Sequence, residues 1–201
     1  MSVRKIVLAT NNLGKLKEFQ QLFATDGGYS VNLLPQSDFV VGSVEETGLS
    51  FVENAIIKAR YACLHSGLPA IADDSGLVVD ALRGEPGILS ARYAGPDNND
   101  EANNQLLLDN LKHVPESQRN ARFHCALVYM QHEADPMPIV SQASWEGQIL
   151  FAPRGENGFG YDPLFYLPYS GCSSAELEPE QKNRISHRGQ ALKKLLGELA
   201  L

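Results

Sequence analysis

The sequence predicts an α/β fold, because its N-terminal part has the pattern of a strand, a helix and a second strand. Residues 5–9 (KIVLA) form a continuous apolar run, which is typical of a strand buried on both faces. Residues 15–23 carry apolar side chains at helical spacing. Residues 29–34 alternate well enough to predict the second strand.

The best-defined element is a helix over residues 50–66. Ser50 and Glu53 form a capping-box pattern, and the apolar side chains behind them repeat at helical spacing. Gly67 and Pro69 come next, and these two residue types end helices.

The rest of the chain continues to alternate strands with helices. A short strand at residues 70–72 is expected to run into the polar residues 73–76. Further strands are predicted at 77–82, 122–130, 142–151 and 164–167, and further helices at 100–114, at 179–184 and after Ser186. Residues 83–99 and the glycine-rich residues 155–162 are predicted to be loops.

Length and charge narrow the class of protein. A chain of 201 residues, 43% hydrophobic and 20% charged, suits one globular domain over residues 1–201. Its 17 Lys and Arg against 24 Asp and Glu give a net charge of −7, which argues against a nucleic-acid-binding protein. No apolar run has membrane-spanning length and no secretory signal is evident, so we expect a cytoplasmic protein that does not bind membranes. The three widely spaced cysteines predict neither a disulfide framework nor a zinc site.

Basic residues stand at two predicted helix N-termini, where the helix dipole favours acidic ones. Lys15 and Lys17 follow the polar turn at residues 10–14, and His187 and Arg188 follow a serine. One such cluster alone is equally well explained by exposed cations. A phosphate satisfies both a cation and the N–H groups of a helix N-terminus. The two clusters together therefore favour an anion-binding site.

Two pairs of acidic residues give a second indication. Asp73 and Asp74 follow a short buried strand, where carboxylates of an α/β sheet commonly line a ligand crevice. Glu45 and Glu46 follow a Gly-Ser turn. Carboxylates near phosphates suit Mg²⁺, which takes one or two protein carboxylates together with phosphates and water. The competing interpretations are a capped turn for the first pair and a solvated loop for the second.

Six motifs follow one another along nearly the whole chain. They are LATNNxxK at 8–15, EETG with ENA and KA at 45–59, ADDSGL at 72–77, PGIxSARY at 86–93, GFGYDP at 158–163 and KxxISHRG at 182–189. Each motif is modestly specific, whereas six in this order are strong evidence. On these motifs the chain resembles the inosine triphosphate pyrophosphatase-like family, and most closely its bacterial dITP/XTP pyrophosphatases.

The resemblance implies an elongated mixed-sheet α/β fold with two lobes around a central nucleotide cleft. It also implies a homodimer and a requirement for Mg²⁺. The implied reaction is hydrolysis of deaminated purine nucleoside triphosphates (ITP, dITP and XTP) to the monophosphate and diphosphate. Such hydrolysis cleanses the nucleotide pool and prevents incorporation of these bases into DNA and RNA.

The resemblance assigns roles to single residues as well. Glu46 and Asp74 are implied to bind Mg²⁺, and Asp74 is also the implied proton acceptor in catalysis. The residues implied to bind the triphosphate are Thr10, Asn11, Asn12, Leu13, Gly14, Lys15 and Lys58. Those implied to contact the rest of the nucleotide are Ser75, Phe159, Gly160, Tyr161, Asp162, Lys182, His187 and Arg188.

Several alternatives stay open at this point. A kinase or synthetase could use the same phosphate cradle with a second pocket for an acceptor, and a binding module could use it without catalysis. Lys58 could be a solvated cation, and Phe159 and Tyr161 could fill the core instead of facing a base. The sequence does not separate Glu45 from Glu46 as a metal ligand, and it does not show how guanine is rejected.

Overall fold

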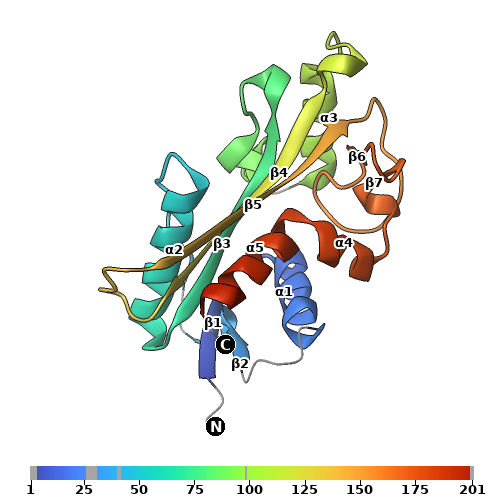
Figure 1. The fold of residues 1–201 in the computed structure, drawn as a ribbon. Coiled ribbons are helices and arrows are strands. Elements are labelled where there is room, and N and C mark those ends of the chain that lie inside the picture. Colours follow the sequence, from blue (N-terminus) through green and yellow to red (C-terminus); the bar gives the residue numbers. More distant parts are fainter. Residues whose placement is uncertain (1–3, 26–30, 40–41, 98, 200–201) are drawn as a thin grey trace. The chain divides into compact units, whose positions relative to one another are not determined.

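The computed structural model describes residues 4–25, 31–39, 42–97 and 99–199 (Figure 1). Within these residues one sheet has seven strands: β1 (Arg4–Ala9), β2 (Val31–Pro35), β3 (Ala70–Val79), β4 (Asn120–Met130), β5 (Ile139–Ile149), β6 (Phe165–Leu167) and β7 (Cys172–Ser173). The α-helices are α1 (Leu13–Thr25), α2 (Phe51–Ser66), α3 (Asp100–Asn110), α4 (Pro179–Ile185) and α5 (His187–Glu198). The predicted α/β fold class is confirmed. None of the described helices is both long enough and apolar enough to span a bilayer.

The sheet is mixed, as expected. Its strand order is β2-β1-β3-β4-β5-β6-β7. β1 pairs in parallel with β2 and with β3, and its last residue, Ala9, lies opposite Ala72 of β3. β6 pairs antiparallel with both β5 and β7.

The chain forms two compact units, each made of separate segments. Unit 1 consists of Met1–Asp74, Cys125–Ala143 and Arg188–Leu201, and unit 2 consists of Ser75–His124 and Ser144–His187. Strands β3, β4 and β5 each contribute residues to both units. The expectations of a single domain and of a nucleotide cleft between two lobes stay predictions.

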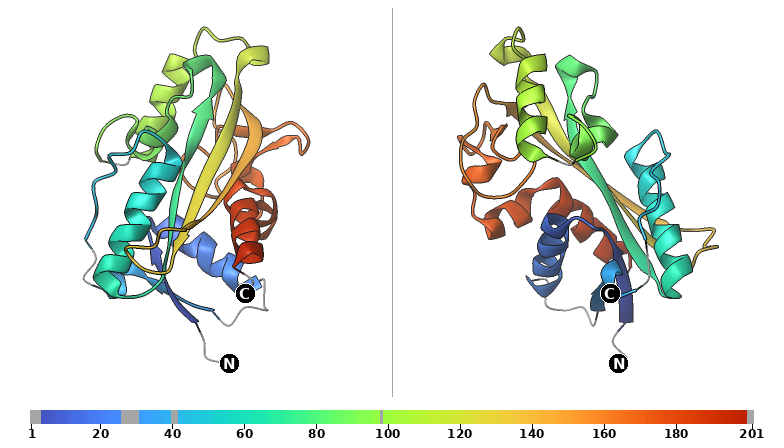
Figure 2. Two further views of the ribbon diagram at one scale, coloured as in Figure 1. Left: turned by 60° about the vertical axis from the view of Figure 1, so that its left-hand side comes forward. Right: turned by 180° about the vertical axis from the view of Figure 1, so that it is seen from behind.

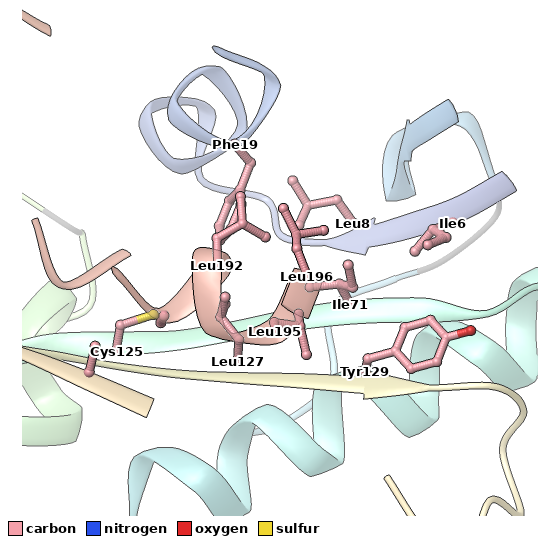
Figure 3. Close-up of a cluster of buried hydrophobic side chains, with 12 residues drawn as sticks. Ile6, Leu8, Phe19, Ile71, Cys125, Leu127, Tyr129, Leu192, Leu195 and Leu196 are labelled. Atoms are coloured by element: carbon pink, nitrogen blue, oxygen red, sulfur yellow. The ribbon is translucent and has the colours of Figure 1, made fainter. Parts of the chain in front are cut away.

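The core of unit 1 follows from the pleat of its strands, because successive side chains of a strand point to opposite faces. One buried cluster joins alternate residues of β1, β3 and β4 to α1 and α5, and Figure 3 shows its members Ile6, Leu8, Phe19, Ile71, Cys125, Leu127, Tyr129, Leu192, Leu195 and Leu196. The intervening residues, Val7 and Ala9 among them, pack against α2 in another cluster. Unit 1 is therefore a three-layer arrangement, with α2 on one side of the strands and α5 on the other (Figure 2).

The capped helix predicted over residues 50–66 is confirmed as α2. The Ser50 side chain accepts a hydrogen bond of 3.4 Å from the N–H of Glu53, and its hydroxyl donates one of 2.7 Å to the Glu53 carboxylate. Gly67 ends the helix at φ 67°, a left-handed conformation that glycine adopts without a steric penalty.

The structure corrects several predicted boundaries. Most importantly, the strand predicted to end at residue 72 continues as β3 to Val79, so the competing interpretation of Asp73 and Asp74 as a capped turn is wrong. α1 begins at Leu13, so Lys15 lies in its first turn and Lys17 beyond it. The helix predicted to reach residue 114 ends at Asn110, and the strand predicted at 142–151 spans 139–149. Residues 29 and 30 of the second predicted strand lie outside the described residues.

Arg119 connects the end of α3 to the end of β5 by hydrogen bonds inside unit 2. Its side chain is 1% exposed. The guanidinium donates hydrogen bonds to the carbonyls of Leu111 (2.8 Å), Ile149 (2.7 Å) and Leu150 (2.9 Å). It also lies 4.2 Å from the centroid of the Phe151 ring. A residue in a polar stretch of sequence is thus a buried structural cation.

Candidate active site

Asp73 and Asp74 lie within β3, directly beyond the point where β1 ends. The register between the two strands stops at Ala9 and Ala72. The prediction that these carboxylates lie at a strand end is therefore wrong for β3 itself, although they do lie beside the carboxyl end of its parallel neighbour. Ile71 belongs to the cluster with α1 and α5, and Ala72 to the cluster with α2. By the same alternation, Asp73 faces α1 and α5, and Asp74 faces α2.

Asp73 accordingly meets the cations of α1 and α5. Its side chain is fully buried and forms an ion pair with Lys15 of α1. The Nε of Arg188 in α5 lies 3.7 Å from Asp73 Oδ2, and the thiol of Cys125 donates to the same oxygen at 3.1 Å. Burial by itself would raise the pKa of Asp73, but the charges of Lys15, Arg188 and Lys58 outweigh it and hold that pKa well below its usual range.

Arg188 has a second carboxylate partner in unit 1. Its side chain is 3% exposed and forms an ion pair with Glu18 of α1. Burial would lower the pKa of Arg188, but Glu18 and Asp73 together raise it. In this structure the anion that accompanies the basic residues at both helix N-termini is thus a carboxylate. The position of these cations alone therefore does not establish a site for a bound anion, and that site stays a prediction.

Asp74 meets the cation of α2. The Nζ of Lys58 lies 2.7 Å from Asp74 Oδ1 and 2.9 Å from Glu46 Oε1. Asn54, one helical turn before Lys58, donates to Asp74 Oδ2 at 3.4 Å. The Lys58 side chain is 14% exposed, so its interpretation as a solvated cation is wrong. Glu46 faces this cluster, whereas Glu45 is exposed.

The protonation of this second cluster differs from that of Asp73. Burial raises the pKa of Asp74, and the opposing charges of Lys58 and Lys15 do not fully cancel that effect. Burial would lower the pKa of Lys58, but Asp74 and Glu46 raise it above its ordinary value. Asp74 is therefore the carboxylate of the pair that more readily takes up a proton.

The polar turn before α1 is organised by its own side chains. The N–H of Asn12 donates to the hydroxyl of Thr10 at 3.2 Å, and the Asn12 side chain accepts from the N–H of Lys15 at 3.0 Å. Asn11 accepts a hydrogen bond from Gln36, which follows β2. Residues 11–13 are exposed, so the turn presents its polar groups to solvent at the end of β1.

In unit 2, Asp162 holds the predicted glycine-rich loop together. It is 2% exposed, and it accepts hydrogen bonds from the N–H of Phe159 (2.9 Å), the hydroxyl of Ser174 (2.9 Å) and Nζ of Lys182 (2.6 Å). The same Lys182 Nζ lies 5.0 Å from the centroid of the Phe159 ring. Asp162 and Lys182 thus fix the position of Phe159.

Two further residues that the resemblance assigned to the nucleotide are buried in unit 2. Tyr161 is 4% exposed, and its hydroxyl donates to the carbonyl of Ser90 at 2.8 Å, so the structure places this ring in the core. His187 is 4% exposed and stacks on Phe123, with ring centroids 4.9 Å apart and an interplanar angle of 11°. Trp145 completes a cluster of three rings, because its centroid lies 6.4 Å from that of His187 and 6.5 Å from that of Phe123. Contact of these rings with a nucleotide stays a prediction.

Comparison with known proteins places the chain in a family. The sequence profile of the Ham1 family matches residues 6–198. This chain belongs to the Ham1 family.

Two relatives and one solved structure illustrate the likeness. The dITP/XTP pyrophosphatase of Thioalkalivibrio sulfidiphilus is 58% identical over 195 residues, which cover 97% of this chain and 98% of the relative. The dITP/XTP pyrophosphatase of Vibrio parahaemolyticus is 57% identical over 198 residues, 98% of each chain. The structure of a HAM1 protein from Coxiella burnetii matches with a TM-score of 0.90 and 49% identity, and 98% of each chain is covered. The resemblance drawn from the six motifs is confirmed.

Within this Ham1-family chain, the donor set fits a hard divalent cation. Among the residues that the structure describes, no three His, Cys, Asp or Glu side chains gather into a metal cluster. Glu46 and Asp74 nevertheless both bind the ammonium of Lys58, so their oxygens already accommodate one positive charge between them. Mg²⁺ needs only one or two carboxylates when phosphates and water complete its coordination.

Sequence reasoning missed three residues of these clusters: Asn54, Glu18 and Cys125. The first could have been found, because Asn54 and Lys58 are four residues apart on the helix predicted over residues 50–66 and so share a face. Glu18 and Cys125 carry no local signal. Their partners lie far away in the sequence and are brought near only by the packing of α1, α5 and β4.

Replacing Lys15 by methionine should lower the stability of the fold, because the substitution takes one cation from the fully buried Asp73. We expect a loss of about 1–3 kcal/mol, because Arg188 and Cys125 still contact the carboxylate. Thermal unfolding measures it, with Lys17→Met, an exposed lysine of the same helix, as the control. Equal melting temperatures for the two variants would contradict the structural role of the Lys15–Asp73 pair.

Proposed function

We propose that this protein hydrolyses noncanonical purine nucleoside triphosphates, namely dITP, XTP and ITP, to the monophosphate and diphosphate. The observation that carries the proposal is the cluster in unit 1, where Asp74 and Glu46 converge on Lys58 beside the buried Lys15–Asp73 pair. Phosphoryl chemistry needs neutralised charge and positioned groups more than a covalent nucleophile, and this cluster supplies both. Relatives more than half identical over nearly the whole chain carry the name dITP/XTP pyrophosphatase.

We propose Mg²⁺ as the cofactor of this reaction. Glu46 and Asp74 would hold it, because both already bind a cation and both offer hard oxygen ligands. When bound, Mg²⁺ supplies charge neutralisation at the phosphate oxygens. Lys58 would then be free to turn from the carboxylates towards a phosphate.

We assign the remaining steps, phosphate binding, proton transfer and contact with the base, to single side chains. Lys15, in the first turn of α1, binds phosphate oxygens together with the N-terminal end of that helix. Asp74 accepts the proton of the attacking water, and its raised pKa brings it closer to the range in which a general base works at neutral pH. In unit 2, Phe159 is held firmly enough by Asp162 and Lys182 to serve as a platform for the base.

The resemblance supports three further proposals. They are a homodimer, a cytoplasmic location and a role in keeping deaminated bases out of DNA and RNA. Each stays a prediction that rests on the family.

Diphosphate release from dITP, XTP, ITP, GTP and ATP tests the proposed function. We expect kcat/KM for the three noncanonical nucleotides to exceed that for ATP by roughly a hundredfold, since donors matched to a 6-oxo group are left unpaired by a 6-amino group. Activity should require Mg²⁺ and disappear with EDTA. Equal turnover of ATP, or phosphate transfer to an acceptor in place of diphosphate release, would refute the proposal.

A further inference from the structure

We propose that Asp100 and Asn104 of α3 are positioning residues that fix the backbone of Gly160 and thereby hold Phe159 for contact with the base. The inference deepens the proposed function and rests on it, because that function assigns the loop around Phe159 to the nucleotide. All of these residues belong to unit 2.

The spacing of the two side chains suits this role. Asn99 caps α3 by accepting a hydrogen bond of 3.1 Å from the N–H of Ala102, so Asp100 is the first residue of the helix. Asn104 follows four residues later and therefore lies on the same face, one turn further along. The Asp100 carboxylate offers a hydrogen-bond acceptor, and the Asn104 amide offers a donor.

The two groups of Gly160 receive these two partners. The N–H of Gly160 donates to Asp100 Oδ2 at 2.7 Å, and its carbonyl accepts from Asn104 Nδ2 at 2.9 Å. The amide of Asn104 takes this orientation although its buried Oδ1 has no hydrogen-bond partner within the described residues. One helix thus binds both backbone polar groups of one loop residue, the residue next to Phe159.

A pocket lies beside these two hydrogen bonds. A space of about 410 Å³ lies between α3 and the loop, and its lining includes Asp100, Asn104, Leu108, Gly158, Phe159 and Gly160. Beside this space, the two hydrogen bonds to Gly160 connect the loop to α3. On the other side, Asp162 binds the N–H of Phe159. The loop is therefore held from two directions, and α3 supplies one of them.

Loss of either hydrogen bond should weaken substrate binding more than turnover. The variants Asp100→Ala and Asn104→Ala should each raise KM for dITP about fivefold and leave kcat within about twofold, because binding is lost while the reacting groups stay in place. Asp100→Asn retains an acceptor oxygen for Gly160 and should restore KM to near the wild-type value.

Adjacent residues of α3 provide matched controls. Glu101→Ala removes an equal charge from the same helix N-terminus, and Gln105→Ala removes an amide one position beyond Asn104. Both side chains line the cavity, and the hydrogen bond described for Gln105 goes to Asp109 of its own helix. Both controls should behave like the wild type. A KM for Asp100→Ala and Asn104→Ala equal to that of the controls, or a fall in kcat with KM unchanged, would overturn the positioning role.

Amide hydrogen exchange at Gly160 gives a readout that needs no substrate. Its N–H donates to Asp100, so exchange should accelerate at least about fivefold in Asp100→Ala and stay unchanged in Glu101→Ala. Unchanged exchange in Asp100→Ala would overturn the inference. Wild-type protein that fails to hydrolyse dITP and XTP would instead refute the proposed function, and the exchange experiment would still decide whether Asp100 fixes the loop.

Discussion

Replacing Asp74 by asparagine should lower kcat for dITP by at least about a hundredfold and leave the fold intact. The substitution keeps the size of the side chain and an oxygen that can accept from Lys58. It removes the charge that the proposed function uses twice, as a ligand of Mg²⁺ and as the acceptor of the proton from water. Because burial raises the pKa of Asp74, folding favours the neutral form of this carboxyl group relative to the unfolded chain, and a neutral amide should be tolerated.

The measurements are kcat for diphosphate release and the melting temperature of the same sample. The adjacent acidic pair offers a matched comparison for the other proposed ligand. Glu46→Gln should lose activity, because Glu46 shares Lys58 with Asp74, whereas Glu45→Gln changes an exposed carboxylate and should not. A fully active Asp74→Asn, or activity that persists in EDTA, would contradict the proposed mechanism.

Replacing Arg119 by methionine should cost at least about 3 kcal/mol of folding free energy. Methionine retains much of the length of the side chain but donates no hydrogen bonds. The carbonyls of Ile149, Leu150 and Leu111 would then lose a donor inside unit 2, although Leu111 keeps a hydrogen bond from the N–H of Val114. An unsatisfied buried carbonyl costs about 1–3 kcal/mol. For a chain of this size, the melting temperature should fall by roughly 6–12 °C.

Arg122 supplies the control for this experiment. It lies three residues further along the chain and pairs with Asp80 and Glu146, but its side chain is 33% exposed. Solvent-exposed ion pairs contribute little, so Arg122→Met should cost less than about 1 kcal/mol. If thermal or denaturant unfolding gave similar losses of folding free energy for the two variants, the buried hydrogen bonds of Arg119 would contribute no more to stability than the exposed ion pairs of Arg122.

The elements that sequence reasoning predicted well are those with a strong local signal. The apolar run of β1 and the Ser50–Glu53 cap of α2 are of this kind, since adjacent residues determine both. The motifs in their order were also sufficient to find the family. Local chemistry thus determines most strands and most helices.

What local patterns could not show is how buried charges are compensated. The segment Asp73–Gly76 has the composition of a turn, yet it continues β3, because Lys15, Arg188 and Lys58 approach from three helices and allow both carboxylates to be buried in the strand. Arg119 was overlooked for the same reason. The guanidinium of Arg119 donates to carbonyls at the ends of other elements, and no sequence pattern around residue 119 predicts these hydrogen bonds.

The ring cluster of Phe123, Trp145 and His187 also gives the protein a built-in spectroscopic probe. Trp145 is the only tryptophan in the chain, it is 7% exposed, and it belongs to unit 2. Its fluorescence therefore follows the exposure of unit 2 to water, whereas far-ultraviolet circular dichroism follows the helices and strands of both units. Superimposed unfolding curves from these two signals would identify the protein as a single cooperative unit, and an earlier fluorescence change would reveal unit 2 as the part that opens first.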